Sequence, residues 1–232
     1  MPRDPHSVSA EPHLGSPARA KDAVDHEVWS EPCRPAGARA ADPSKTLCGQ
    51  LRQQWGRVSW GRSWGVVAAL SLVAGPFAVL AAFLKTSAPT GLLAALIAAP
   101  LVEELGKAVV PLMVLERRPY LFAAGGQLVL VGAFSGLVFA AIENALYLHV
   151  FVGDPTASLR AWRWGICTAV HVGCSSIAGL GLRRMWRAAR ASSSLAGMSL
   201  AAPCLIAAMI VHGAYNAAAI ALERTGALSF AE

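Results

Sequence analysis

Five long apolar segments account for most of the sequence after residue 63. Each is close to the roughly 20 residues that an α-helix needs to cross a hydrocarbon core about 30 Å thick. Hydrophobic residues make up 55% of the chain and charged residues only 15%, which is too apolar for an ordinary soluble domain. The sequence therefore predicts an all-α fold, a polytopic membrane bundle of about five transmembrane helices. The predicted helices cover about residues 64–84, 90–115, 126–151, 164–182 and 199–221.

The parts of the chain outside this bundle (residues 64–222) differ in composition. Residues 1–50 carry half of the prolines and no apolar periodicity, so we expect a disordered cytoplasmic tail without a signal peptide. Residues 51–63 combine arginine with tryptophan, a pairing typical of the membrane–water interface. Residues 223–232 form a short C-terminal tail.

Arginines mark one side of the predicted bundle. They precede the first segment and separate the second from the third and the fourth from the fifth. With five crossings these groups share one side, which the positive-inside rule assigns to the cytoplasm. We therefore expect a multi-pass protein of the cell membrane with its N-terminus inside and its C-terminus outside. The same clustering accounts for the net charge of +6 and argues against nucleic acid as a partner. The groups are Arg52, Arg57 and Arg62; Arg117 and Arg118; and Arg183, Arg184, Arg187 and Arg190.

The second apolar segment contains three ionisable residues near its centre, Glu103, Glu104 and Lys107. Ionisable groups at bilayer depth are costly and usually functional. Lys107 follows the two acids by four and three residues, so it can neutralise either of them within one helix. One carboxylate would then be paired for structure, which leaves the other for chemistry. A buried ion pair that only sets helix packing is the alternative.

Polar residues recur in the last three apolar segments. The third contains Glu143 with Asn144, on a helix that also offers Gly132 and Gly136 as a close-packing pair. The fourth contains His171. Cys167 and Cys174 share a helix face with this histidine, so a Cys-His-Cys zinc site is a weaker alternative to a purely structural role of the cysteines.

The fifth segment contains His212 and, four residues later on the same face, Asn216, which could orient the imidazole. On these spans Glu103, His171 and His212 lie near the centres of their helices, and Glu143 about one turn away. Carboxylates and imidazoles at one depth suit a catalytic zinc with an open position. They equally suit a metal-free carboxylate base that acts on water. A proton- or ion-coupled transporter and a non-catalytic membrane scaffold are the alternatives from other classes.

Four motifs in order resemble the PrsW family of intramembrane proteases, which is similar in turn to the CAAX prenyl protease superfamily. They are Glu103-Glu104-x-x-Lys107, Phe139-Ala-x-x-Glu143-Asn144-x-x-Tyr147, His171 with the small residues after it, and His212-x-x-x-Asn216. The resemblance covers about residues 92–222. It implies a membrane-embedded metallopeptidase that cleaves membrane-tethered regulators such as anti-sigma factors. In the wider superfamily the second motif ends in histidine, where this chain has Glu143, so zinc and metal-free glutamic mechanisms both stay open.

These observations predict an intramembrane endopeptidase. Glu103 or Glu104 would activate water, and Lys107 would hold the other acid. Glu143, His171 and His212 would bind zinc or stabilise the oxyanion, and Asn216 would support His212.

Overall fold

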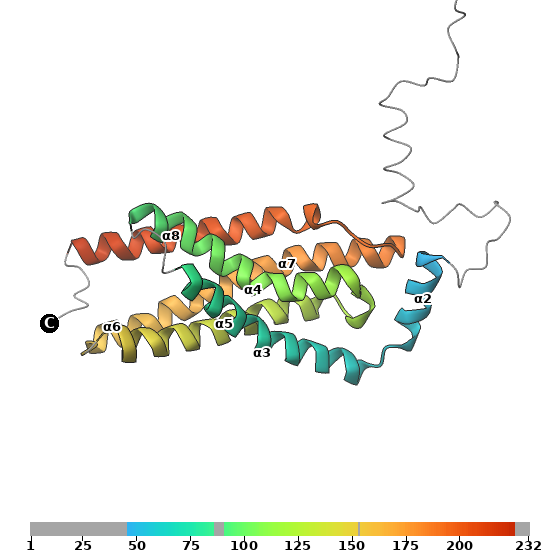
Figure 1. The fold of residues 1–232 in the computed structure, drawn as a ribbon, viewed down its shortest axis with the longest axis horizontal. Coiled ribbons are helices and arrows are strands. Elements are labelled where there is room, and N and C mark those ends of the chain that lie inside the picture. The colour runs from blue at the N-terminus through green and yellow to red at the C-terminus, as the bar shows by residue number, and fades with distance from the viewer. Residues whose placement is uncertain (1–45, 86–90, 153, 226–232) are drawn as a thin grey trace, which may run out of the picture.

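The computed structural model of the chain describes residues 46–85, 91–152 and 154–225, and every regular element within these ranges is helical (Figure 1). The predicted all-α fold is therefore confirmed. The predicted tail at residues 1–50 lies almost wholly outside the described residues, as does most of the predicted tail at 223–232.

The helices follow one another with short connections. Three of them continue without a break through π-helical turns, which often occur at functional sites. In chain order the elements are α2 (Leu47–Arg57), α3 (Trp60–Lys85), η2 (Ala94–Ala98), α4 (Ala99–Arg117), η3 (Pro119–Leu121), α5 (Gly126–Leu146), η4 (Tyr147–Phe151), α6 (Ala157–Trp162), η5 (Arg163–Cys167), α7 (Thr168–Ser192), η6 (Met198–Leu200) and α8 (Ala202–Arg224).

Among the described residues, four helical stretches are long and apolar enough to span a membrane: Trp60–Leu80, Gly126–Phe151, Ala157–Ser192 and Ala202–Arg224. The second predicted span, residues 90–115, corresponds to η2 and α4, which fall outside this set. The reason is that α4 contains Glu103, Glu104 and Lys107 within its apolar stretch, and all three are buried. Figure 1 shows α4 running along the bundle beside the other long helices, and Glu103, Glu104 and Lys107 are buried within the protein.

Two sequence boundaries differ from the prediction. The fourth span was expected at 164–182, but α6, η5 and α7 form one helical run from Ala157 to Ser192. Thr156 begins this run, because its hydroxyl accepts a hydrogen bond from the Leu159 amide at 3.2 Å, as an N-cap residue does. The arginines expected in a connection, from Arg183 to Arg190, instead lie in the last turns of α7. This helix ends at Ser192, and the C-cap residue Ser193 has a φ of 52°.

The arginine-rich segments meet at one end of the bundle. In Figure 1, α2 lies at the end where α4 connects to α5 and α7 to α8. Arg52 of α2 donates to the Ser193 hydroxyl at 3.1 Å. The guanidinium of Arg190 lies 5.3 Å from the centre of the Trp55 ring and 6.0 Å from that of Trp186. Arginine and tryptophan thus pack together where the sequence predicted an interface.

Helices α5 and α7 pack closely because two glycines of α5 face the backbone of α7. A Cβ atom on Gly136 would lie 2.5 Å from the carbonyl oxygen of His171, and one on Gly132 would collide with the carbonyl oxygen of Ser175. The predicted small-residue pair is therefore a real contact. It fixes the backbone of His171 against α5, and so it positions one side chain of the site described next.

Candidate active site

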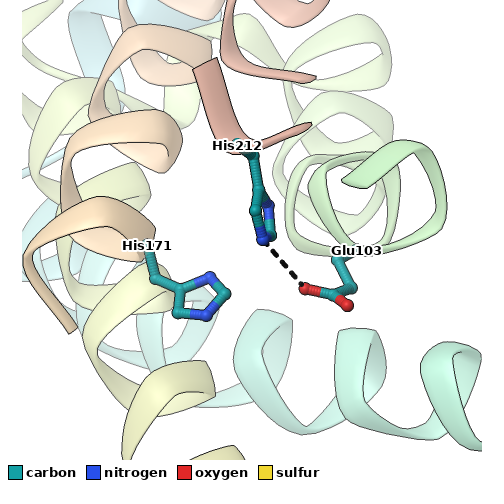
Figure 2. Close-up of side chains that lie close together, drawn as sticks. All are labelled: Glu103, His171 and His212. Atoms are coloured by element: carbon teal, nitrogen blue, oxygen red, sulfur yellow. Dashed lines mark ion pairs between the residues drawn. The ribbon is translucent and has the colours of Figure 1, made fainter. Parts of the chain in front are cut away.

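Three side chains from three helices point toward the same space (Figure 2). Glu103 comes from α4, His171 from α7 and His212 from α8, and all three are buried. The imidazole centres are 4.8 Å apart and the rings are nearly perpendicular. One ligand atom from each of the three residues lies within 4.8 Å of the others. The predicted convergence of these helices at one depth therefore brings a carboxylate and two imidazoles together.

Glu104 is fully buried and has two partners. Lys107 Nζ lies 2.5 Å from Glu104 Oε1, and His212 Nδ1 lies 2.9 Å from the same oxygen. The predicted pairing of Lys107 with one of the two acids is confirmed. Because an ionised carboxylate only accepts hydrogen bonds, His212 Nδ1 is the donor, and Nε2 of a neutral His212 carries the lone pair. A carboxylate that orients an imidazole in this way is common behind metal-binding histidines.

Glu143 has a corresponding pair of partners on the other side of His171. Its Oε2 atom lies 3.0 Å from Arg163 Nη2 and 3.0 Å from His171 Nε2. By the same reasoning His171 Nε2 donates to Glu143, and Nδ1 carries the lone pair. Lys107 Nζ lies 3.2 Å from that Nδ1 and can only donate, which agrees with this tautomer. The ring of Phe139 closes the site, 4.4 Å from Lys107 Nζ and 4.8 Å from the His171 ring centre.

Two acceptors in the site face each other without a donor between them. His212 Nε2 and Glu103 Oε2 are 3.7 Å apart, and Glu103 Oε2 is a buried oxygen without a hydrogen-bond partner among the described residues. Such an arrangement is unfavourable unless a proton, a water molecule or a cation lies between the two atoms. Two imidazoles with one carboxylate are a ligand set found in catalytic zinc sites. The residues present therefore fit a divalent metal.

The structure groups the predicted metal ligands differently from the prediction. His171 and His212 were expected to act with Glu143, but the acid that lies with both histidines is Glu103. Glu143 instead forms a second group of potential ligands with Cys167 and His171. Of the cysteines in the weaker Cys-His-Cys alternative, Cys174 belongs to neither of the groups found in the described residues. Cys167, Cys174 and Cys204 are buried and free of disulfides.

Asn216 contacts the backbone of another helix rather than His212. Its side-chain amide donates to the carbonyl oxygen of Ala95 at 2.9 Å. One turn earlier on α8, a Cβ atom on Gly213 would collide with the carbonyl oxygen of Leu96. Asn216 and Gly213 therefore hold η2, the π-helical turn that leads into α4 and Glu103.

Arg163 was not among the predicted site residues. The predicted spans left it in the connection before the fourth segment, whereas Arg163 begins η5 and lies beside Glu143. The signal was present in the sequence, because Asp154, Pro155 and Thr156 together are typical of a helix start. A helix that began at Ala157 would have included Arg163 and extended the fourth span toward the site.

A comparison with protein families supports this site. The profile described as PrsW family intramembrane metalloprotease matches residues 53–231, well over half of the chain, including every site residue named above. No curated protein and no solved structure matches the sequence. The resemblance that the four motifs predicted is thus confirmed. This multi-pass membrane protein belongs to the PrsW family of intramembrane metalloproteases.

Proposed function

We propose that the chain is an endopeptidase that hydrolyses a peptide bond in a membrane-associated protein, with Glu103 as the water-activating carboxylate. The observation that carries this proposal is the pair of facing acceptors, Glu103 Oε2 and His212 Nε2, 3.7 Å apart. The neighbouring acid, Glu104, is occupied by Lys107 and His212. Each acid has one buried oxygen without a hydrogen-bond partner among the described residues, but only that of Glu103 is described facing His212 Nε2, and Glu103 is not the acid that Lys107 pairs with.

In the proposed reaction, Glu103 accepts a proton from water while the water oxygen attacks the carbonyl carbon of the peptide bond. The C–N bond then breaks, and Glu103 returns the proton to the departing amine nitrogen. The products are a carboxylic acid and an amine, so atoms and charge balance. Glu104 keeps His212 oriented through the Nδ1 hydrogen bond, and Lys107 keeps Glu104 in place.

We further propose that Glu103, His171 and His212 hold the metal and that the metal is zinc. These donors suit Zn²⁺, which supplies Lewis acidity when bound. A carboxylate has two oxygens, so contact of one with a cation leaves the other to accept a proton. His171 would use Nδ1, since Nε2 is occupied by Glu143. Lys107, now 3.2 Å from Nδ1, would have to give up that contact.

The proposed substrate is a membrane-tethered protein, of which an anti-sigma factor or another regulator is an example. The site lies among helices that are long and apolar enough to span a membrane, so a substrate segment would have to enter from the bilayer or its surface. Membership of a protease family argues against the alternative of an ion-coupled transporter or a scaffold.

The test of this function is Glu103→Gln, with Glu116→Gln at the other end of α4 as the matched control. The rate of cleavage of a co-expressed membrane-tethered reporter should fall by about 10²–10⁴ in the first variant and be unchanged in the second. Both proteins should stay folded in detergent. Cleavage at the parent rate by Glu103→Gln would exclude Glu103 as the base. Full activity of metal-free parent protein in chelator would exclude a role for zinc but would be compatible with Glu103 as the base.

We also propose the orientation, with the N-terminus in the cytoplasm and the C-terminus outside. The arginine groups at one end of the bundle support it through the positive-inside rule. A reporter inserted after Ser193, between α7 and α8, should then be cytoplasmic, and one fused after Glu232 should be external. Neutral replacements of Arg183, Arg184 and Arg187 should produce mixed orientations, whereas the reverse labelling of the two reporters in the parent would contradict the proposal.

A further inference from the structure

His171 belongs to two overlapping groups of potential metal ligands. The first joins it to Glu103 and His212, and the second joins it to Glu143 and Cys167. In the second group, Glu143 Oε2 lies 3.0 Å from His171 Nε2 and 3.9 Å from Cys167 Sγ. Thiolate, imidazole and carboxylate are all zinc ligands, and thiolate is the softest of them. By donor chemistry alone, the second group could compete for the metal.

Arg163 forms an ion pair with Glu143, the carboxylate of the second group. Its Nη2 atom lies 3.0 Å from Glu143 Oε2, and the side chain is only 13% exposed. A guanidinium cannot lose its proton in a protein, so it keeps a positive charge at this position. A metal ion bound to the same oxygen would meet that positive charge at close range and be repelled by it.

Arg163 makes further contacts through its backbone and through its guanidinium. Its carbonyl oxygen accepts hydrogen bonds from Asn144 Nδ2 at 2.9 Å and from Thr168 Oγ1 at 3.1 Å. Its guanidinium lies 4.3 Å from the centre of the Tyr147 ring. Glu143, Asn144 and Tyr147 are neighbours on α5 and η4, so Arg163 contacts a single turn through its backbone and its guanidinium. Movement of the guanidinium away from Glu143 would also separate it from the Tyr147 ring.

Lys107, the cation next to the first group, is arranged differently from Arg163. Lys107 is also close to His171, but its carboxylate partner is Glu104, which is not a member of that group. The carboxylate that the first group does use, Glu103, keeps a buried oxygen without a hydrogen-bond partner. Lys107 therefore does not pair with Glu103, the carboxylate of the first group, whereas Arg163 pairs with Glu143, the carboxylate of the second.

We propose that Arg163 is a positioning residue that closes the Glu143, Cys167 and His171 group to metal and reserves His171 for Glu103 and His212. The proposal builds on the function proposed above, in which His171 binds a metal. Loss of Arg163 frees Glu143, and a metal ion can then bind Glu143, Cys167 and His171. Binding through Cys167 breaks the S–H bond, and its proton passes to the buffer. Binding through His171 Nε2 requires the ring proton to move from Nε2 to Nδ1.

The experiment uses Co²⁺ as the probe, titrated into the full-length purified protein in detergent. Cobalt bound to thiolate gives an intense charge-transfer absorption in the near ultraviolet, and cobalt bound only by nitrogen and oxygen does not. Arg163→Gln and Arg163→Met should both gain this absorption, at one thiolate-bound Co²⁺ per folded protein. Adding Cys167→Ala to either variant should abolish it. Arg163→Lys, which keeps the charge, should resemble the parent.

The matched control is Arg160→Gln, because Arg160 is an exposed arginine on α6 that contacts only the Pro155 carbonyl among the interactions described for its side chain. Its Co²⁺ spectrum should equal that of the parent. The parent and parent Cys167→Ala should also give identical spectra. This comparison needs no change at Arg163, so it stays informative if the arginine variants fold poorly.

Either of two results would overturn the proposal. One is a thiolate absorption in the folded parent, and the other is its absence from both folded Arg163→Gln and folded Arg163→Met. Failure of the proposed function looks different. If the parent binds no Co²⁺ while Arg163→Gln gains the thiolate absorption, the metal-binding role of Glu103 and His212 is wrong and the role of Arg163 stands.

Discussion

Two carboxylates of this site have the same kinds of partner in different surroundings. Glu104 forms an ion pair with Lys107 and lies within hydrogen-bond distance of His212. Glu143 forms an ion pair with Arg163 and lies within hydrogen-bond distance of His171. Glu104 is fully buried and takes its cation from one turn further along α4. The Glu143 side chain is 32% exposed and takes its cation from another helical segment, 20 residues further along the chain.

The Glu104 pair is a fully buried ion pair within one helix, and the Glu143 pair is a partly exposed ion pair between two helical segments. Loss of one partner of a buried pair leaves an uncompensated charge without water, which is costly. Water can partly replace a lost partner at a group that is one-third exposed. We therefore expect the Glu104 ion pair to contribute most to the free energy of unfolding. The Glu143 ion pair should mainly determine which atoms are available to a metal.

The largest effect is expected at the Glu104 pair. Glu104→Gln or Lys107→Met should each lower the free energy of unfolding by about 3–5 kcal/mol, because each leaves the other charge buried and unpaired. The double variant should lose less than the sum of the two, because it leaves no unpaired charge. Thermal or denaturant unfolding in detergent measures these values.

Glu116→Gln is the control for that comparison, since Glu116 lies at the partly exposed end of the same helix. It should change stability by less than about 0.5 kcal/mol. A Glu104→Gln protein as stable as this control would show that the two carboxylates do not differ as argued.

An intermediate effect is expected at Asn216, which contacts the turn before α4, the helix that carries Glu103 and Glu104. Asn216→Ala removes the hydrogen bond to the Ala95 carbonyl and loosens the turn that leads into α4. Metal affinity and cleavage rate should fall by about 10–100-fold, as for other residues that orient a ligand without touching the metal. Metal titration and reporter cleavage measure the two effects. An Asn216→Ala protein that loses stability but keeps the parent metal affinity would limit this residue to packing.

The smallest effect on stability is expected at Glu143. Glu143→Gln keeps the shape of the side chain and removes the charge, and its amide oxygen can still accept a hydrogen bond from the Arg163 guanidinium. The free energy of unfolding should fall by about 1 kcal/mol, as for a partly exposed ion pair. Combined with Arg163→Gln, the loss should be smaller than the sum, because both changes break one contact. A loss as large as that of Glu104→Gln would mean that the partial exposure of Glu143 does not lower the cost of breaking its ion pair.

The sequence by itself determined the features that depend on one helix at a time. Apolar length predicted the helices, and the spacing of Glu104 and Lys107 predicted their ion pair, because residues three apart on a helix are neighbours. The arginine groups, and Gly132 with Gly136, were also readable from position alone. Four motifs in order were enough to predict the family.

The tertiary structure alone decided which groups meet across helices. A helical wheel gives the direction of a side chain within its helix, but the rotation and depth of the neighbouring helix depend on packing. The sequence therefore could not tell that Glu103 rather than Glu143 lies with both histidines, or that Asn216 holds the turn before α4. Arg163 is the clearest case, because its partner Glu143 is on another helix and only the close packing of α5 with the run from α6 to α7 brings the two charges together.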